Sequence, residues 1–156
     1  MKGSPNIIDA LNDILTAELT AVNQYFLHAK MCKNWGFKRL YEHIYKESID
    51  EMKHADELVE RILFLEGVPN VQRYWKINVG ETVPEQLEID VKMEYDAVER
   101  FRKAIRLCRD EGDETSAEML EHMLESEEEH VDWLETQLSL LNTLGPQHYL
   151  AQQIHD

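Results

Sequence analysis

The sequence predicts an all-α fold, an antiparallel four-helix bundle with one long crossover and a short fifth helix at its C-terminal end. Two observations lead to this prediction. Glycine and proline are scarce, with 6 and 4 among 156 residues, and they fall between the periodic segments. Within those segments apolar residues recur at intervals of three and four, which is the period of a helix that buries one face.

Five helices are expected, and one long segment separates the second from the third. The first opens at Ser4-Pro5, with a serine cap and a proline in the first turn. The third opens at a capping box formed by Thr82 and Glu85. Segment 66–82 lacks periodicity and is long enough to run the length of the bundle. The predicted helices are 4–34, 38–65, 83–111, 114–143 and 147–154.

The composition is that of one acidic globular domain, 1–156, with a length that allows a real core. A net charge of −15 argues against nucleic acid as a partner, and it is compatible with binding cations. The two cysteines, Cys32 and Cys108, lack the spacing of a thiolate metal site and fit a reducing, cytoplasmic location. No signal peptide or membrane-spanning run is recognised, so no membrane partner is expected.

A Glu-x-x-His motif occurs once on the second predicted helix and once on the fourth. Its two polar residues share a helix face, because positions i and i+3 are neighbours on a helix surface. Each motif glutamate is preceded, 33 positions upstream, by one glutamate set into the apolar stripe of the preceding helix, and the whole set repeats at an offset of 76. The six residues are Glu18, Glu51, His54, Glu94, Glu127 and His130.

This set predicts a dinuclear metal site. Four buried carboxylates need cations or protons to balance them, and oxygen with imidazole ligands suits iron, manganese or zinc. Two ferrous ions can reduce oxygen in a two-electron step, whereas zinc would occupy the same ligands without redox chemistry. A single motif would be a weak signal, and the run at 127–129 alone could be a solvated face. Two motifs with identical upstream spacing favour the metal site.

At these residues, and over essentially its whole length, the chain resembles the bacterioferritins, a branch of the ferritin-like di-iron carboxylate family. The long crossover and the short last helix belong to the resemblance, and His130 favours this branch over eukaryotic-type ferritins. The resemblance implies a ferroxidase that uses dioxygen or peroxide, with the six residues as ligands of two iron ions per subunit. It also implies iron storage and detoxification in a homo-oligomeric shell of 24 subunits filled with ferric mineral.

The resemblance implies further roles, each with a plainer alternative. Met52 matches an axial ligand of haem b, one from each subunit across a two-fold axis, although a methionine also simply fills helix interfaces. Tyr25 matches an electron donor near the iron site, and core packing is the alternative. Trp133 is either a redox aromatic or an interface residue. A small ferredoxin is the implied reductant for iron release. Residues matching an iron-entry pore are Asn34, Glu66, Asp132 and Thr136.

Two positions depart from the family pattern. Lys46 replaces a histidine that some members use for an extra iron site, so that site is not expected here. Ser126 replaces a common aspartate, whereas Asp50 retains it in the first half of the chain. Because carboxylates orient metal-bound histidines, we expect the two metal positions to differ in affinity. The remaining histidines are interpreted as surface or packing residues: His28, His43, His122, His148 and His155.

Two other functions remain open from the sequence. A standalone di-iron oxidase or oxygenase would need a substrate pocket, and the apolar stripes beside the site suggest no vacancy. A non-catalytic cage would use the same acids merely to sequester metal. We expect the size of the assembly and the initial rate of iron oxidation to separate these functions.

Overall fold

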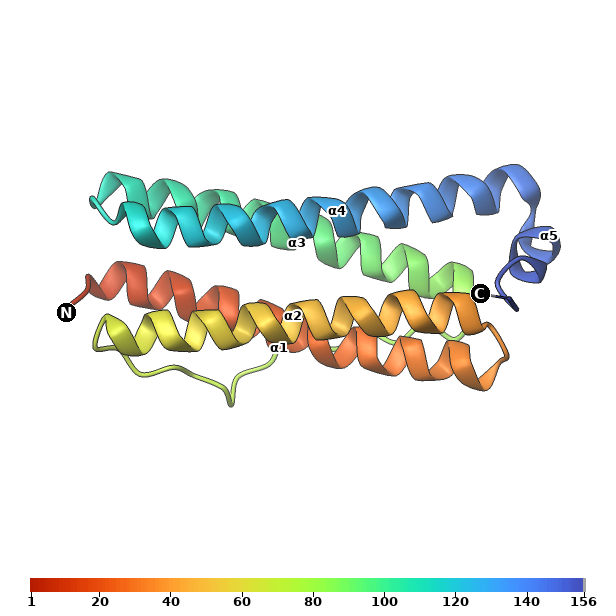
Figure 1. The fold of residues 1–156 in the computed structure, drawn as a ribbon, viewed down its shortest axis with the longest axis horizontal. Helices are drawn as coiled ribbons and strands as arrows, with labels where there is room; N and C mark the ends of the chain where they lie inside the picture. Colours follow the sequence, from red (N-terminus) through yellow and green to blue (C-terminus); the bar gives the residue numbers. More distant parts are fainter. Residues whose placement is uncertain (156) are drawn as a thin grey trace.

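The computed structural model describes residues 1–155 and confirms the ferritin-like four-helix bundle. Figure 1 shows the four long helices side by side, with the short fifth helix across one end of the bundle. No helix in the described residues is both long and apolar enough to cross a lipid bilayer. The helices are α1 (Pro5–Asn34), α2 (Lys38–Phe64), α3 (Val83–Asp110), α4 (Glu114–Leu144) and α5 (Pro146–Ala151).

Local sequence signals account for the starts of the long helices. Ser4 caps α1, since its hydroxyl accepts the N–H of Asn6 at 3.2 Å. Thr82 caps α3 by accepting the N–H of Glu85 at 3.3 Å. The Glu85 carboxylate returns to the N–H of Glu81 at 2.9 Å, one residue earlier than in a standard capping box. These caps satisfy N–H groups that a helix leaves free at its first turn.

Two tight turns make the antiparallel hairpins α1–α2 and α3–α4. Gly36 and Gly112 adopt φ angles of +91° and +80°, a region in which a side chain is strained. The last helix differs from the prediction, because α5 ends at Ala151 and not at residue 154. The N–H groups of Gln152 and Gln153 bond three residues back, and the Gln153 carbonyl then accepts the N–H of Arg39 at 2.9 Å. The chain therefore turns toward the start of α2.

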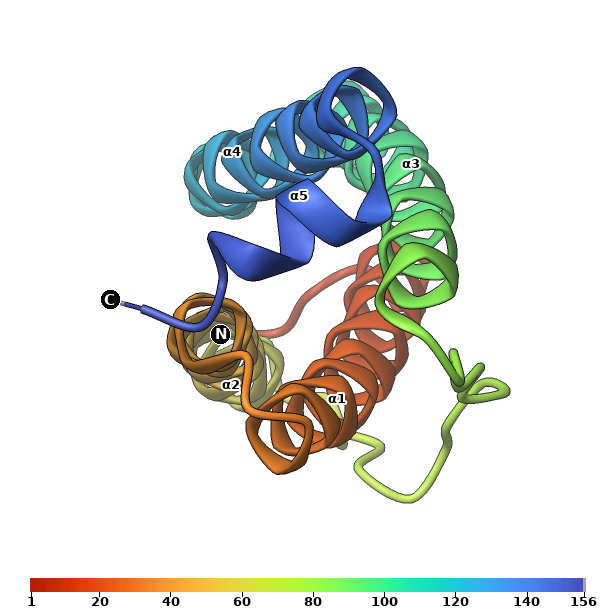
Figure 2. The same ribbon diagram turned by 90° about the vertical axis from the view of Figure 1, so that its right-hand side faces the viewer.

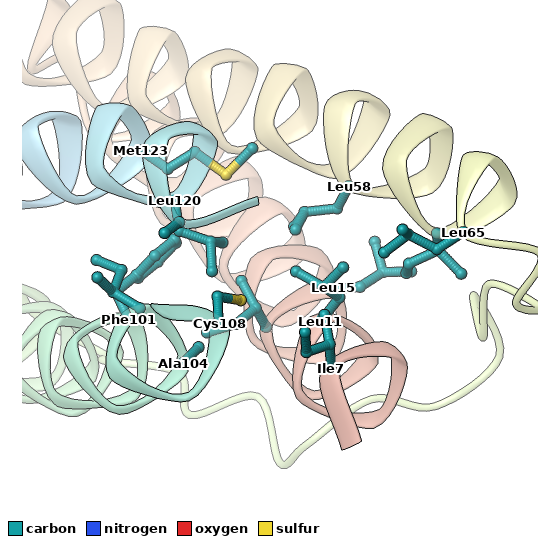
Figure 3. Close-up of a cluster of buried hydrophobic side chains, with 14 of the residues drawn as sticks. Ile7, Leu11, Leu15, Leu58, Leu65, Phe101, Ala104, Cys108, Leu120 and Met123 are labelled. Carbon is teal, nitrogen blue, oxygen red and sulfur yellow. The ribbon is translucent and has the colours of Figure 1, made fainter. Parts of the chain in front are cut away.

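The interior divides into two apolar clusters along the bundle axis. One cluster, shown in Figure 3, combines Leu11 of α1, Leu58 of α2, Phe101 of α3 and Leu120 of α4. The other surrounds Tyr25 and includes residues of α2, α3, α4 and α5. Buried glutamates from all four long helices lie between the two clusters in sequence position. A layer of buried glutamates therefore lies between two apolar parts of the core.

The crossover is bound to one face of α1 by a ladder of polar side chains. Figure 2 shows it passing outside α1 on its way to α3. Each rung is a hydrogen bond between a polar side chain of α1 and the crossover, four residues further along the helix each time. Rungs four apart share a helix face. The α1 residues of the ladder are Asn12, Thr16, Thr20, Gln24 and His28.

Candidate metal centre

The structure brings all six predicted ligand residues together inside the bundle. Each glutamate is at most 1% exposed, and each comes from a different long helix. The two histidines follow their motif glutamates by one helical turn and are almost as buried, with side chains 12% and 6% exposed. Sequence spacing alone located this cluster, because hairpins of matched length place the four glutamates at the same height.

The six residues form two overlapping groups, each compact enough for one metal ion. Within each group the candidate ligand atoms lie within 4.8 Å of one another. Glu51 and Glu127 belong to both groups. One group adds Glu18 and His54, and the other adds Glu94 and His130. The arrangement therefore provides two shared carboxylates, with one carboxylate and one imidazole at each end.

Most of the candidate ligand atoms in this cluster are buried and lack hydrogen-bond partners. Both carboxylate oxygens of Glu18 and of Glu127 are unpaired, as is the Nδ1 of each histidine. The Nδ1 of His54 lies 3.3 Å from Glu127, and that of His130 lies 3.0 Å from Glu51. A buried polar atom without a partner is costly unless something absent from the protein atoms satisfies it. Metal cations suit this set of oxygens and imidazole nitrogens.

Without metal, protons compensate for the crowded negative charge. Burial, reinforced by Glu127, raises the pKa of Glu51 to about 8. Burial and the same neighbour raise the pKa of Glu94 well above its usual value. Burial opposes ionisation of Glu127 too, but its interactions with Glu94 and the two nearby histidines outweigh burial, so the pKa of Glu127 falls below the usual range. Burial disfavours the charged form of His130, yet the close carboxylates of Glu127, Glu51 and Glu94 raise its pKa far above normal.

The two histidines differ in the contact that Nε2, the ring nitrogen on the side away from the centre, makes. The Nε2 of His130 lies 3.5 Å from Oδ2 of Asp50, which is the orienting contact expected from the sequence. In residues 1–155 no hydrogen bond reaches the Nε2 of His54. Ser126 lines the same surface groove as His54, so the serine occupies the matching place without a carboxylate.

Tyr25 is fully buried against the centre. Its hydroxyl donates to Oε1 of Glu94 at 2.5 Å, and its ring lies edge-on to the imidazole of His130, with centroids 6.1 Å apart. Burial and the nearby acids Glu94 and Glu47 raise the pKa of this phenol well above its usual value. The tyrosine is thus the aromatic residue in direct contact with a candidate ligand.

The other predicted residues lie away from the cluster. Met52 is 50% exposed on α2, on the outward side of the helix from Glu51. Trp133 stacks on His43, with ring centroids 3.8 Å apart, within one subunit. The four predicted pore residues are all exposed. Asn34 ends α1, whereas Glu66 follows the far end of α2, so a single chain does not bring these four together.

Beside the centre lies a cavity of about 790 Å³ between α1, α3 and the crossover. The sequence suggested no vacancy here, and that expectation was wrong. The apolar stripes are filled, but α1 and α3 pack less closely against each other than the helices within each hairpin, and the crossover borders the cavity between them. Glu18, Glu51, Glu94 and Glu127 all line this cavity.

Sequence reasoning missed two buried acids outside the ligand set, Asp90 and Glu47. Asp90 of α3 forms hydrogen bonds with Gln24 and His28, the last two α1 residues of the ladder. The four-residue period of polar residues along the first helix was a readable signal for the ladder. Glu47 is 2% exposed, with one oxygen bonded to His43 at 2.9 Å and the other unpaired. Nothing in its sequence context marked Glu47 as buried.

Comparison with known proteins agrees with this geometry. Residues 8–144 match the family model Ferritin, described as a ferritin-like domain. Bacterioferritin BfrA of Mycobacterium tuberculosis is 51% identical over 152 residues, which cover 97% of this chain and 96% of that protein. Bacterioferritin of Streptomyces coelicolor is 47% identical over 154 residues, covering 99% and 92%. The chain therefore belongs to the bacterioferritin family.

Proposed function

We propose that this protein stores iron and is a ferroxidase, which oxidises Fe(II) at the buried centre. The observation that carries the proposal is the pair of overlapping ligand groups, in which unpaired atoms of Glu51 and Glu127 serve both positions. Fe(II) is the substrate, and the six residues fit it. Oxygen and imidazole ligands suit ferrous iron, and the buried negative charge requires cations.

The two ferrous ions supply one electron each, so that one dioxygen with two protons gives one hydrogen peroxide, or one hydrogen peroxide with two protons gives two water molecules. The chain's own residues prepare this reaction. Glu51 and Glu94 lose their protons as cations enter, because burial and the neighbouring Glu127 raise their pKa values and the positive charge of the cations favours the ionised carboxylates. Asp50 holds the ring of His130, and Tyr25 holds a proton against Glu94. We assign Tyr25 as the residue that can give an additional electron.

The test is stopped-flow oxidation of Fe(II) by dioxygen. We expect Glu18→Ala and Glu94→Ala each to reduce the initial rate by about a hundredfold or more, because each substitution removes a ligand from one ion. Glu128→Ala is the matched control, since Glu128 is an exposed acid beside a ligand on the same helix. An unchanged initial rate in the ligand variants would instead identify a non-catalytic cage.

Storage requires a container, and we propose a homo-oligomeric shell of 24 subunits with ferric mineral inside, in the cytoplasm. Pore residues Asn34, Asp132, Glu66 and Thr136 would then meet between copies, which suits their exposure. Size-exclusion chromatography separates this from a standalone oxidase, for which the cavity beside the centre provides room. A particle of several hundred kilodaltons supports storage, whereas a monomer or dimer supports the oxidase. A small ferredoxin is proposed as the reductant for release.

Met52 fits the proposed haem b ligand. Its thioether lies on an exposed strip with Ile49 of α2 and with Phe26, whose ring contacts Tyr45 at 6.1 Å between centroids. Such a strip suits an interface between two copies, where paired methionines would hold the haem iron. Haem would supply a route for electrons. We expect Met52→Leu to abolish the visible haem spectrum while the assembly keeps its size, and retention of that spectrum would refute the assignment.

A further inference from the structure

We infer that the cavity beside the centre is the entrance for the uncharged oxidant, and that Fe(II) reaches the ligands by another path. This rests on the proposed ferroxidase function and goes beyond it by assigning separate routes to the two substrates. The cavity lies between α1, α3 and residues 75–79 of the crossover. It connects the surface with the carboxylates of the centre.

The inner end of the cavity consists of metal-ligand candidates. All four glutamates of the centre line it, and each is at most 1% exposed. Its walls combine apolar residues with three uncharged polar ones. The apolar residues include Ala17 and Ala21 of α1, Met93 and Ala97 of α3, and Val79 of the crossover, and the polar ones are Thr20, Gln24 and Asn78. Its volume of about 790 Å³ far exceeds that of dioxygen or hydrogen peroxide. Dioxygen passes apolar walls with little desolvation cost, whereas a hydrated divalent cation gains no carboxylate ligand from these walls before it reaches the glutamates at the inner end.

The outer end of the cavity carries the wrong charge for ferrous iron. Three cations line it, Lys76, Lys92 and Arg100, against one acid outside the ligand set, Asp96. All four are exposed, which places them toward the surface. Like charges at an entrance lower the local concentration of a cation and leave an uncharged molecule unaffected. The acids of the centre attract Fe(II), but at this opening the nearer positive charges oppose its approach.

The structure also fixes one of these cations in place. The guanidinium of Arg100 lies over the ring of Trp75, 3.8 Å from its centroid, which is a cation–π contact between α3 and the crossover. The backbone N–H of Trp75 in turn donates to Oγ1 of Thr20 on α1 at 3.0 Å. Arg100 is therefore held across the opening by contacts that reach both helices bordering the cavity.

The experiment measures the two substrates separately in the assembled protein. Ala97→Phe narrows the cavity from α3, and Val79→Trp narrows it from the crossover. Anaerobic binding of Co(II), followed by its visible absorbance, reports cation entry. Mixing protein preloaded with Fe(II) against limiting dioxygen gives the second-order rate constant for the oxidant. We expect both variants to lower that rate constant several-fold while the Co(II) binding rate stays at the wild-type value.

Ala97→Ser is the control, because it changes the same position without filling the cavity, and it should match the wild type in both measurements. Circular dichroism and the Co(II) stoichiometry show whether each variant is folded. The inference is overturned if both variants slow Co(II) binding as much as oxidation, or if neither slows oxidation. Failure of the wild type to bind two Co(II) per subunit would refute the proposed function itself.

Discussion

His28 and Asp90 form a fully buried pair, with Nδ1 of the imidazole 3.0 Å from Oδ1 of the carboxylate. The Nε2 of the same ring accepts the backbone N–H of Gly80 at 3.0 Å. Because Nε2 acts as an acceptor, Nδ1 carries the proton, and the ring donates to Asp90 as a neutral imidazole. The pair thus joins α1, α3 and the end of the crossover in one contact.

We expect His28→Phe to lower the free energy of unfolding by about 3 kcal/mol, because it leaves Asp90 and the Gly80 N–H buried without this partner. Chemical denaturation measures the change. His155→Phe is the control, since His155 is exposed and should change stability by less than about 0.5 kcal/mol. Combining His28→Phe with Asp90→Leu should restore part of the loss, because the carboxylate that lost its partner is removed as well. A double variant less stable than His28→Phe would contradict this account.

The sharing of Glu51 and Glu127 between the two ligand groups predicts unequal losses. Glu18→Ala should leave about one tightly bound Co(II) per subunit, since it affects one group. Glu51→Ala should weaken both positions together. Calorimetric titration of the metal-free protein measures the stoichiometry. Equal stoichiometries for the two variants would show that the carboxylates do not act as shared ligands.

A carboxylate orients His130 but not His54, and this difference predicts unequal metal affinities at the two positions. Asp50→Ser should weaken the position that uses His130 by about 10-fold to 100-fold, the usual effect of losing an orienting carboxylate. Ser126→Asp should strengthen the position that uses His54 and bring the two affinities together. Titration with Co(II) resolves the two steps. The idea fails if the wild-type positions are indistinguishable.

Metal binding to this centre should release protons and strengthen as pH rises from about 6 to about 8. The pKa of Glu51 is raised from 4.5 to about 8 in the folded, metal-free protein. The contribution of neutral Glu51 to the free energy of unfolding is therefore fully present below the pKa that this group has in the unfolded chain. It is lost as the pH rises through the raised pKa of the folded protein. Cations oppose that loss. Titrations in two buffers with different ionisation enthalpies count the protons, and a buffer-independent binding enthalpy would contradict the prediction.

Glu66 occupies the left-handed region at the end of α2, with φ +64°. The N–H of Gly67 closes the helix end by bonding to the Ile62 carbonyl at 2.9 Å. Glu66→Gly should therefore raise the free energy of unfolding by about 1 kcal/mol, because glycine adopts this conformation without strain. Glu60→Gly, in the exposed interior of the same helix, should lower it by about 1 kcal/mol. Thermal unfolding measures both variants, and a change in stability of the same sign for Glu66→Gly and Glu60→Gly would refute the explanation.

The bundle was predictable because caps, turns and apolar period agree at every level. Thr82 marks a helix start, Gly36 and Gly112 mark turns, and matched hairpin lengths bring the buried glutamates to one height. The cavity was not predictable, since it depends on how far α1 and α3 lie apart under the crossover. Neither was the burial of Glu47, because an acid in an acid-rich helix looks solvated until tertiary contacts are known.

The ladder between α1 and the crossover restricts how the first helix can change in length. Inserting or deleting one residue between Asn12 and His28 would rotate the rest of the helix by about 100°, so that later side chains of the ladder no longer face the crossover. A change before Glu18 would also turn that carboxylate away from the other ligands. Inserting or deleting roughly one whole turn would keep these side chains on the same helix face, but it would shift them along the helix axis relative to their partners in the crossover. Homologues that keep this connection should therefore show a gap-free first helix, with length variation displaced to the chain ends.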